Sequence, residues 1–202
     1  MLPLLLLSTV LVAGPRVDDP RIEALWAKGT EYAAFGDTLR ARRETWYRNT
    51  AAAAQIPLEL IDRARAVPGT WRFLVITDAR CHDSANTVPF LAALARVSSI
   101  ELRIVSPGQA RWLQEAHRSP DGRLSTPTVI LLNDRFEDVG AWIERPAALQ
   151  TWVLENKPKL PNDKVLEYEF AWYEKDQGRT SLSEIVELLE KAAARRAFQA
   201  PT

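Results

Sequence analysis

Residues 71–97 read WRFLVITDARCHDSANTVPFLAALARV. The apolar run at 71–77 predicts a buried strand, and the apolar stretch from 84 to 97 predicts a helix. Between them lies Cys81, the only cysteine among 202 residues. A helix N-terminus points backbone N–H groups and the positive end of its dipole at the preceding turn, so it favours the thiolate form of a cysteine placed there. Because there is no second cysteine, any redox chemistry would require a bond to another molecule.

Strands and helices alternate on the C-terminal side of this turn. The expected elements are a strand at 71–77, a helix at 83–97, a strand at 100–105, a helix at 107–118, strands at 128–132 and 136–142, and a helix at 145–156. Alternation implies parallel strand pairing, and Asn133-Asp134 suits a hairpin that adds an antiparallel pair. The sequence therefore predicts an α/β fold with a mixed four-stranded sheet flanked by helices.

Helical segments are expected at both ends of this core, which we place at residues 68–157. An N-terminal extension at 19–66 should form two or three helices with breaks at Gly29, Gly36 and Pro57, and its regularly spaced aromatic residues are interpreted as a face packed on the core. A C-terminal extension at 164–198 should form a helix at 164–176 that ends at Gly178. A second helix should begin at Ser181 with Glu184 three residues later, as a capping box.

The first residues and the overall charge limit the classes of function. Residues 1–13 carry no charged side chain. They are shorter than the roughly 20 apolar residues that span a bilayer, but they fit the apolar part of a signal peptide. A leader at 1–15 would make the protein exported or periplasmic, and otherwise it is cytoplasmic; stable membrane insertion is not expected. Acidic and basic residues number 26 each, so no nucleic-acid partner is expected. With two histidines and one cysteine, neither a metal nor another cofactor is expected.

The order of elements resembles the thioredoxin fold, and several motifs strengthen the resemblance over about residues 68–190. Pro89 lies eight positions after Cys81, where thioredoxins have a kinking proline in the active-site helix. Residues 125–128, Ser-Thr-Pro-Thr, precede the third strand, where the family has its cis-proline. Residues 138–146, DVGAWIERP, resemble a Gly-x-Trp…Arg-Pro stretch of a bacterial thioredoxin-like branch. The resemblance implies that Thr126-Pro127 is cis and lies beside Cys81.

Three departures from the family pattern concern the chemistry. Arg80 stands where a tryptophan usually precedes the cysteine, and Ser84 stands where dithiol members have the resolving cysteine. Val75 occupies the position of a buried acid that helps to deprotonate that second thiol. Together these changes argue against dithiol reductase chemistry and leave a Cys-x-x-Ser site.

The candidate catalytic residues are Cys81 and Ser84, and the candidate substrate-binding residues are Arg80, His82, Thr126 and Pro127. Arg80 and a protonated His82 would favour the thiolate, whereas Asp83 would oppose it. His82 is otherwise interpreted as a residue on an exposed turn, and Asp83 and Ser84 as helix caps. His117 is interpreted as solvated surface.

The favoured function is monothiol thiol–disulfide exchange, in which Cys81 attacks a protein or peptide disulfide and is released by an external thiol, for example one of low molecular weight. The alternative is a redox-inactive binding module that holds a peptide or protein partner in the groove around Arg80, His82 and Thr126-Pro127. A third hypothesis is redox sensing through oxidation of Cys81 to sulfenic acid.

Overall fold

A computed structural model describes residues 19–199 of the chain, so the predicted leader lies outside the described residues. The strands are β1 (Arg72–Ile76), β2 (Glu101–Val105), β3 (Thr128–Leu132) and β4 (Asp138–Ile143). The helices are α1 (Arg21–Ala27), α2 (Tyr32–Thr38), α3 (Arg43–Ala52), the short 3-10 helix η1 (Ala53–Gln55), α4 (Leu58–Ala66), α5 (His82–Val97), α6 (Pro107–Ala116), α7 (Ala147–Asn156), α8 (Asn162–Asp176) and α9 (Arg179–Gln199).

The four strands form one mixed sheet in the order β2-β1-β3-β4. β1 pairs with β2 in parallel and with β3 antiparallel, and β3 pairs antiparallel with β4. Both central strands are apolar on both faces, as expected for a sheet covered by helices on each side. The predicted α/β class and the mixed four-stranded sheet are therefore confirmed.

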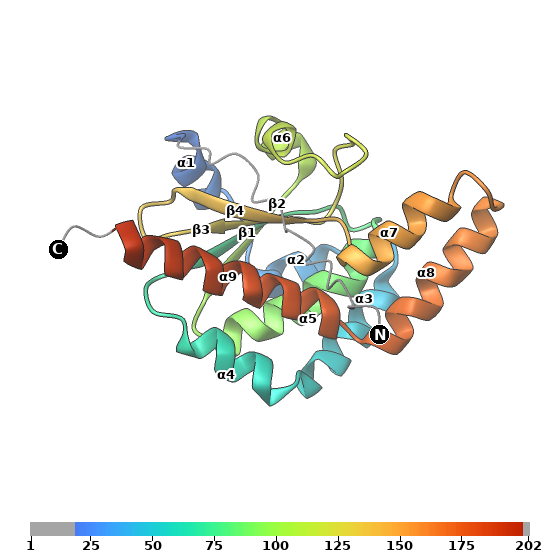
Figure 1. The fold of residues 1–202 in the computed structure, drawn as a ribbon, viewed down its shortest axis with the longest axis horizontal. Coiled ribbons are helices and arrows are strands. Elements are labelled where there is room, and N and C mark those ends of the chain that lie inside the picture. The colour runs from blue at the N-terminus through green and yellow to red at the C-terminus, as the bar shows by residue number, and fades with distance from the viewer. Residues whose placement is uncertain (1–18, 200–202) are drawn as a thin grey trace, which may run out of the picture.

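Alternate side chains of β1 enter two separate apolar layers. Phe73 and Val75 pack in the larger layer with side chains of α3, α4, α5 and α9, whereas Leu74 and Ile76 pack in the smaller layer with α1 and α6. Figure 1 shows α1 and α6 above the sheet and α4, α5 and α9 below it. Val75 is fully buried, so the position of the family's buried acid is part of the apolar core.

Residues 19–66 form four α-helices, where two or three were expected. The predicted break at Gly36 is wrong, because Gly36 lies within α2, and the chain breaks instead at residues 39–42, which contain neither glycine nor proline. Leu39 is 2% exposed there and Arg42 adopts a left-handed backbone conformation with φ 52°. Trp46 on α3 is fully buried in the larger apolar layer, as the packing interpretation of these aromatic residues expected.

The last three helices form a hairpin and a long closing helix. α7 and α8 pack through a small apolar cluster of their own, with Leu149, Val153, Val165 and Tyr173 at its centre. α9 then runs back along the sheet (Figure 1), and Ile185 and Leu189 are fully buried in the larger layer.

The predicted capping box at Ser181 is wrong, because α9 already begins at Arg179. The Glu184 carboxylate instead accepts hydrogen bonds from Trp142 Nε1 at 2.7 Å and from the Ala147 N–H at 2.9 Å. This side chain therefore connects α9 to β4 and to the start of α7.

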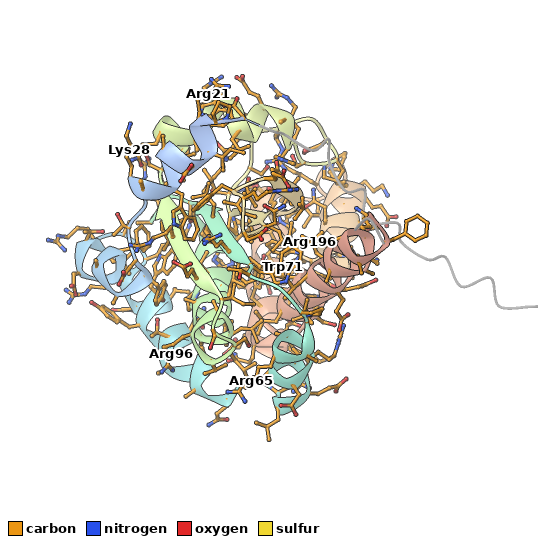
Figure 2. All side chains as sticks on the ribbon, turned by 90° about the vertical axis from the view of Figure 1, so that its left-hand side faces the viewer. Arg21, Lys28, Arg65, Trp71, Arg96 and Arg196 are labelled. Atoms are coloured by element: carbon orange, nitrogen blue, oxygen red, sulfur yellow. The ribbon has the colours of Figure 1, made fainter. Side chains whose placement is uncertain are left out.

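Figure 2 looks at the end of the molecule where β1 begins and where α4, α5 and α9 end. Arg65 near the end of α4 donates to the Val97 carbonyl at the end of α5, at 2.8 Å. Arg196 near the end of α9 pairs with Asp134 in the β3–β4 turn, at 2.7 Å. These contacts connect the C-terminal ends of α4 and α9 to the end of α5 and to the β3–β4 turn.

No described helix is both long and apolar enough to cross a membrane. No group of three or more His, Cys, Asp or Glu side chains within the described part of the chain is arranged to hold a metal ion.

Candidate functional site

Cys81 is the N-cap residue of α5, at the end of the turn that follows β1. Its Sγ accepts a hydrogen bond from the Ser84 N–H at 3.4 Å and donates one to the Thr126 carbonyl at 3.0 Å. The Thr126–Pro127 peptide bond is cis. The structure thus brings the β1–α5 turn and the loop before β3 together at a half-buried thiol.

The environment of Cys81 does not favour the thiolate. Burial raises the pKa of the Cys81 thiol, the negative charge of Asp83 raises it further, and the contacts with Ser84 and Thr126 act in the opposite direction without offsetting the rise. The predicted bias toward thiolate is therefore wrong in this conformation, because desolvation outweighs the hydrogen bonds at the helix N-terminus.

Neither neighbouring base supplies the positive charge that was expected. The Arg80 guanidinium is exposed and pairs with Asp78 at 2.9 Å. His82 is half-buried, and its ring packs edge-on against Phe170 and Tyr173 of α8, with centroid distances of 4.2 and 5.4 Å. Burial, and then nearby arginines, lower the pKa of His82 to about 4, so the ring is neutral at neutral pH. The interpretation of His82 as a residue on an exposed turn is also wrong.

Asp83 does not cap α5 but takes part in a buried charged network. Its Oδ2 accepts from Arg145 Nη2 at 2.8 Å, and its Oδ1 accepts from the Tyr173 hydroxyl at 2.8 Å. Arg145 also pairs with Glu144 and Glu169, each at 3.0 Å. Burial alone would lower the pKa of Arg145, but the three carboxylates raise it overall. This network connects the first turn of α5 to α8 and to the end of β4.

Ser84 is fully buried, and its hydroxyl forms no hydrogen bond with any described residue. Its backbone N–H donates to the Cys81 sulfur, and its side chain lies close enough to lower the pKa of that thiol. The interpretation of Ser84 as a side-chain cap is therefore wrong. A second thiol at this position would lie one helical turn from Cys81, which is the arrangement of a dithiol site.

The loop before β3, which contains Thr126-Pro127, accepts hydrogen bonds from a backbone donor and a side-chain donor. The Glu144 N–H donates to the Pro127 carbonyl at 2.8 Å, and Gln114 Nε2 donates to the Ser125 carbonyl at 2.9 Å. His117 is 1% exposed and pairs through Nε2 with Asp138, so its interpretation as solvated surface is wrong. Burial raises the pKa of Asp138 despite the contact with His117.

A hollow of about 580 Å³ opens on the other side of α5, between α2, α3, α5 and β2. Its walls include Tyr32, Ala53, Pro89 and Leu102, and it contains neither Cys81 nor the residues that contact the sulfur. The hollow is therefore separate from the site around the Cys81 thiol.

A cysteine at the start of a helix, facing a loop before an antiparallel strand of a mixed four-stranded sheet, defines a thioredoxin-like protein. The sequence model of the thioredoxin family matches residues 29–163, and the chain belongs to this family. The match begins ahead of α2 and therefore includes most of the helical segment that precedes β1.

Two solved structures share the fold. A protein of unknown function from Pseudomonas aeruginosa is 24% identical, with a TM-score of 0.65 over 83% of this chain and 96% of that one. An HIV epitope-scaffold is 21% identical, with a TM-score of 0.66 over 84% of this chain and 97% of that one. At these identities the similarity concerns the fold alone. No curated protein matches the chain.

Proposed function

We propose that the protein carries out monothiol thiol–disulfide exchange through Cys81. The observation that supports this most directly is the position of the sulfur, which lies at the N-terminus of α5 against the Thr126 carbonyl, with Ser84 in the place of a second thiol. Arg80, His82, Thr126 and Pro127 surround this position and would contact the substrate.

The proposed reaction has two steps. The Cys81 thiol first loses its proton to solvent, and the thiolate attacks one sulfur of a substrate disulfide; that S–S bond breaks, a Cys81–substrate disulfide forms, and the other substrate sulfur leaves as a thiolate. In the second step, the thiolate of an external low-molecular-weight thiol attacks the substrate sulfur of the mixed disulfide. The Cys81–substrate S–S bond breaks, Cys81 leaves as a thiolate, and the external thiol is oxidised to a disulfide with the substrate. Ser84 cannot take the part of this thiol, since a hydroxyl does not exchange with a disulfide.

A redox-inactive binding module is the second candidate, and the electrostatics of the site favour it. The raised pKa of Cys81 keeps most of the sulfur in the unreactive thiol form at neutral pH. Asp78 pairs with Arg80, and His82 is neutral at neutral pH, so neither of these two neighbours adds a free positive charge that would promote attack. In this alternative the same groove holds a partner without a covalent bond.

Trapping with oxidised glutathione and with a disulfide-containing peptide distinguishes the two functions. Exchange predicts a covalent adduct in the intact mass of the wild type, its absence in Cys81→Ala, and release only when an external thiol is added. Ser84→Cys should shorten the lifetime of the adduct, because an internal thiol could then resolve it. Absence of any adduct, together with partners that co-purify equally with wild type and Cys81→Ala, would establish the binding module instead.

A further inference from the structure

Helix α3 lies along α5 on the same side of the sheet and contacts the turn that carries Cys81 (Figure 1). Three side chains on or just before α3 donate hydrogen bonds to backbone carbonyls around this turn. Trp46 Nε1 donates to the Ala79 carbonyl at 3.0 Å, and Arg42 Nε donates to the Arg80 carbonyl at 2.5 Å. The third donor, Asn49, acts on α5 itself.

Asn49 donates a hydrogen bond to a backbone carbonyl of α5 that lacks a helical partner because of the proline in this helix. Pro89 has no N–H, so the carbonyl of Ala85, four residues earlier, lacks its usual partner within the helix. Asn49 Nδ2 donates to this carbonyl at 2.8 Å and to Asn86 Oδ1 at 2.9 Å. The amide of Asn49 is 3% exposed and thus satisfies a buried acceptor that would otherwise be unpaired.

The three donors form a single row. Positions 42, 46 and 49 are spaced four and three residues apart, which places them on one face of a helix. Their acceptors, Ala79, Arg80 and Ala85, lie on either side of Cys81 in the sequence. We propose that Arg42, Trp46 and Asn49 are positioning residues that clamp the Cys81 turn and thereby keep the thiol closed against Thr126 and low in reactivity.

The electrostatics of the turn agree with this role. Burial is the largest cause of the raised pKa of Cys81, so loosening the turn should lower that pKa toward its ordinary value. The charged and titratable groups around the turn lie on several elements. They are Asp78, Arg80, His82 and Asp83 on the turn and α5, Arg42 at the start of α3 and Arg48 within it, and Arg145 and Tyr173 in the buried network. Among them, only Asp83 adds to the rise at Cys81, and its carboxylate accepts hydrogen bonds from Arg145 and Tyr173.

The test measures the rate of Cys81 alkylation by iodoacetamide as a function of pH. Trp46→Phe keeps a large aromatic side chain and removes the N–H donor. Arg42→Asn removes an exposed donor, and asparagine tolerates the left-handed conformation at this position. Each variant should raise the rate near neutral pH by at least about twofold, with the inflection of the profile moved to lower pH, because a larger thiolate fraction outweighs its lower nucleophilicity.

Tyr32→Phe is the matched control. It removes the hydrogen bond at 2.6 Å between the Tyr32 hydroxyl and Thr50 Oγ1, which joins α2 to α3 without touching the Cys81 turn. The control should leave the alkylation profile unchanged, and amide hydrogen exchange in residues 78–85 should speed up only in the two clamp variants. A Trp46→Phe or Arg42→Asn profile that overlays that of the wild type, or a Tyr32→Phe profile that shifts equally, would overturn the proposal.

The significance of the clamp rests on the proposed exchange function, but its test does not. Alkylation reports on the thiol with a small reagent, whereas trapping reports on a disulfide substrate. A shifted alkylation profile without any trapped adduct would leave the clamp in place and refute thiol–disulfide exchange. A trapped adduct together with unshifted alkylation profiles would support thiol–disulfide exchange and overturn the clamp.

Discussion

At the scale of single residues, Asp83 connects the thiol to the most heavily charged part of the described interior. Its carboxylate lies two positions after Cys81, raises the pKa of the thiol and forms an ion pair with the buried Arg145. One side chain therefore has two separable effects, one on the reactivity of the sulfur and one on the stability of the fold.

Asp83→Asn should accelerate alkylation of Cys81 near neutral pH, because the negative charge that disfavours the thiolate is removed. The same change breaks a buried ion pair and should lower the free energy of unfolding by about 3 kcal/mol, measured by urea denaturation. Glu169→Gln is the control: it also removes a carboxylate from Arg145, but it should destabilise the protein without changing the alkylation rate. Equal alkylation rates in wild type and Asp83→Asn would show that burial alone controls the thiol.

His82 should contribute a distinct pH dependence of stability. Its pKa in the folded protein is about 4, below the ordinary 6.5, so the unfolded chain takes up this proton first as the pH falls. The stabilising contribution is complete above about pH 6.5 and is lost as the pH falls toward 4. The loss should amount to about 2 kcal/mol after allowance for the partial exposure of the ring. Denaturation of wild type and His82→Phe at several pH values measures it, and parallel curves would refute it.

The residues of the site differ in how far the sequence could identify them. Cys81 was singled out by its position between an apolar strand and a helix, and Thr126-Pro127 by the resemblance to thioredoxins, and the structure places Thr126 in contact with Cys81. Arg145 was noticed only as part of an Arg-Pro motif, since nothing local indicates that Asp83, 62 residues away, is its partner. The error in the charge state of Cys81 has the same origin, because burial depends on which distant segments cover the sulfur.

At the scale of elements, the contact between the α8–α9 junction and α5 is unusually close. Gly178 has φ +75°, and a Cβ placed there would lie 2.4 Å from Phe90 Cγ. Phe90 is itself 3% exposed and directly follows Pro89 in α5. The junction can therefore accept only glycine without moving α9 away from α5.

Gly178→Ala should lower the free energy of unfolding by about 3 kcal/mol, because it combines an unfavourable backbone conformation with overpacking. Gly36→Ala is the matched change: Gly36 lies within α2, and a Cβ added there would have no atom within 4 Å. This second variant should raise the free energy of unfolding by about 0.5–1 kcal/mol through helix propensity. Urea denaturation measures both. A neutral result for Gly178→Ala would mean that the junction adapts at little cost.

Helices and strands were predicted where a repeating pattern or a strong turn signal was present. β3 matches the expected strand at 128–132, and the strands and helices of the predicted core begin and end within about two residues of their expected positions. The break between α2 and α3 was expected at Gly36, which lies inside α2, whereas a left-handed arginine, rather than glycine or proline, begins the next helix. The start of α9 was misplaced because Glu184 forms tertiary contacts with Trp142 and Ala147 instead of a local cap.

At the scale of the whole molecule, the larger apolar layer combines side chains from α3 near one end of the described chain and from α9 at the other. Leu189 lies in the middle of α9 and is fully buried against this layer. The core is thus shared between segments that are far apart in the sequence.

Leu189→Ala should lower the free energy of unfolding by about 2–5 kcal/mol, since it leaves a cavity in a layer that α4, α5 and the sheet also form. The transition should remain a single step when followed both by far-ultraviolet circular dichroism and by tryptophan fluorescence. Leu160→Ala, at a 39% exposed position between α7 and α8, should change stability by less than about 1 kcal/mol. Two separated transitions in Leu189→Ala would indicate that α9 unfolds independently.

The position of α9 also has a consequence for the protein while it is being made. The ribosome releases the β1–α5 turn about a hundred residues before α9, because synthesis runs from the N-terminus. Until α9 has emerged, the larger apolar layer lacks the side chains that this helix contributes, among them Ile185 and Leu189. We therefore expect the nascent chain to pass through an interval in which its single thiol is more exposed to oxidants and disulfides than in the folded protein.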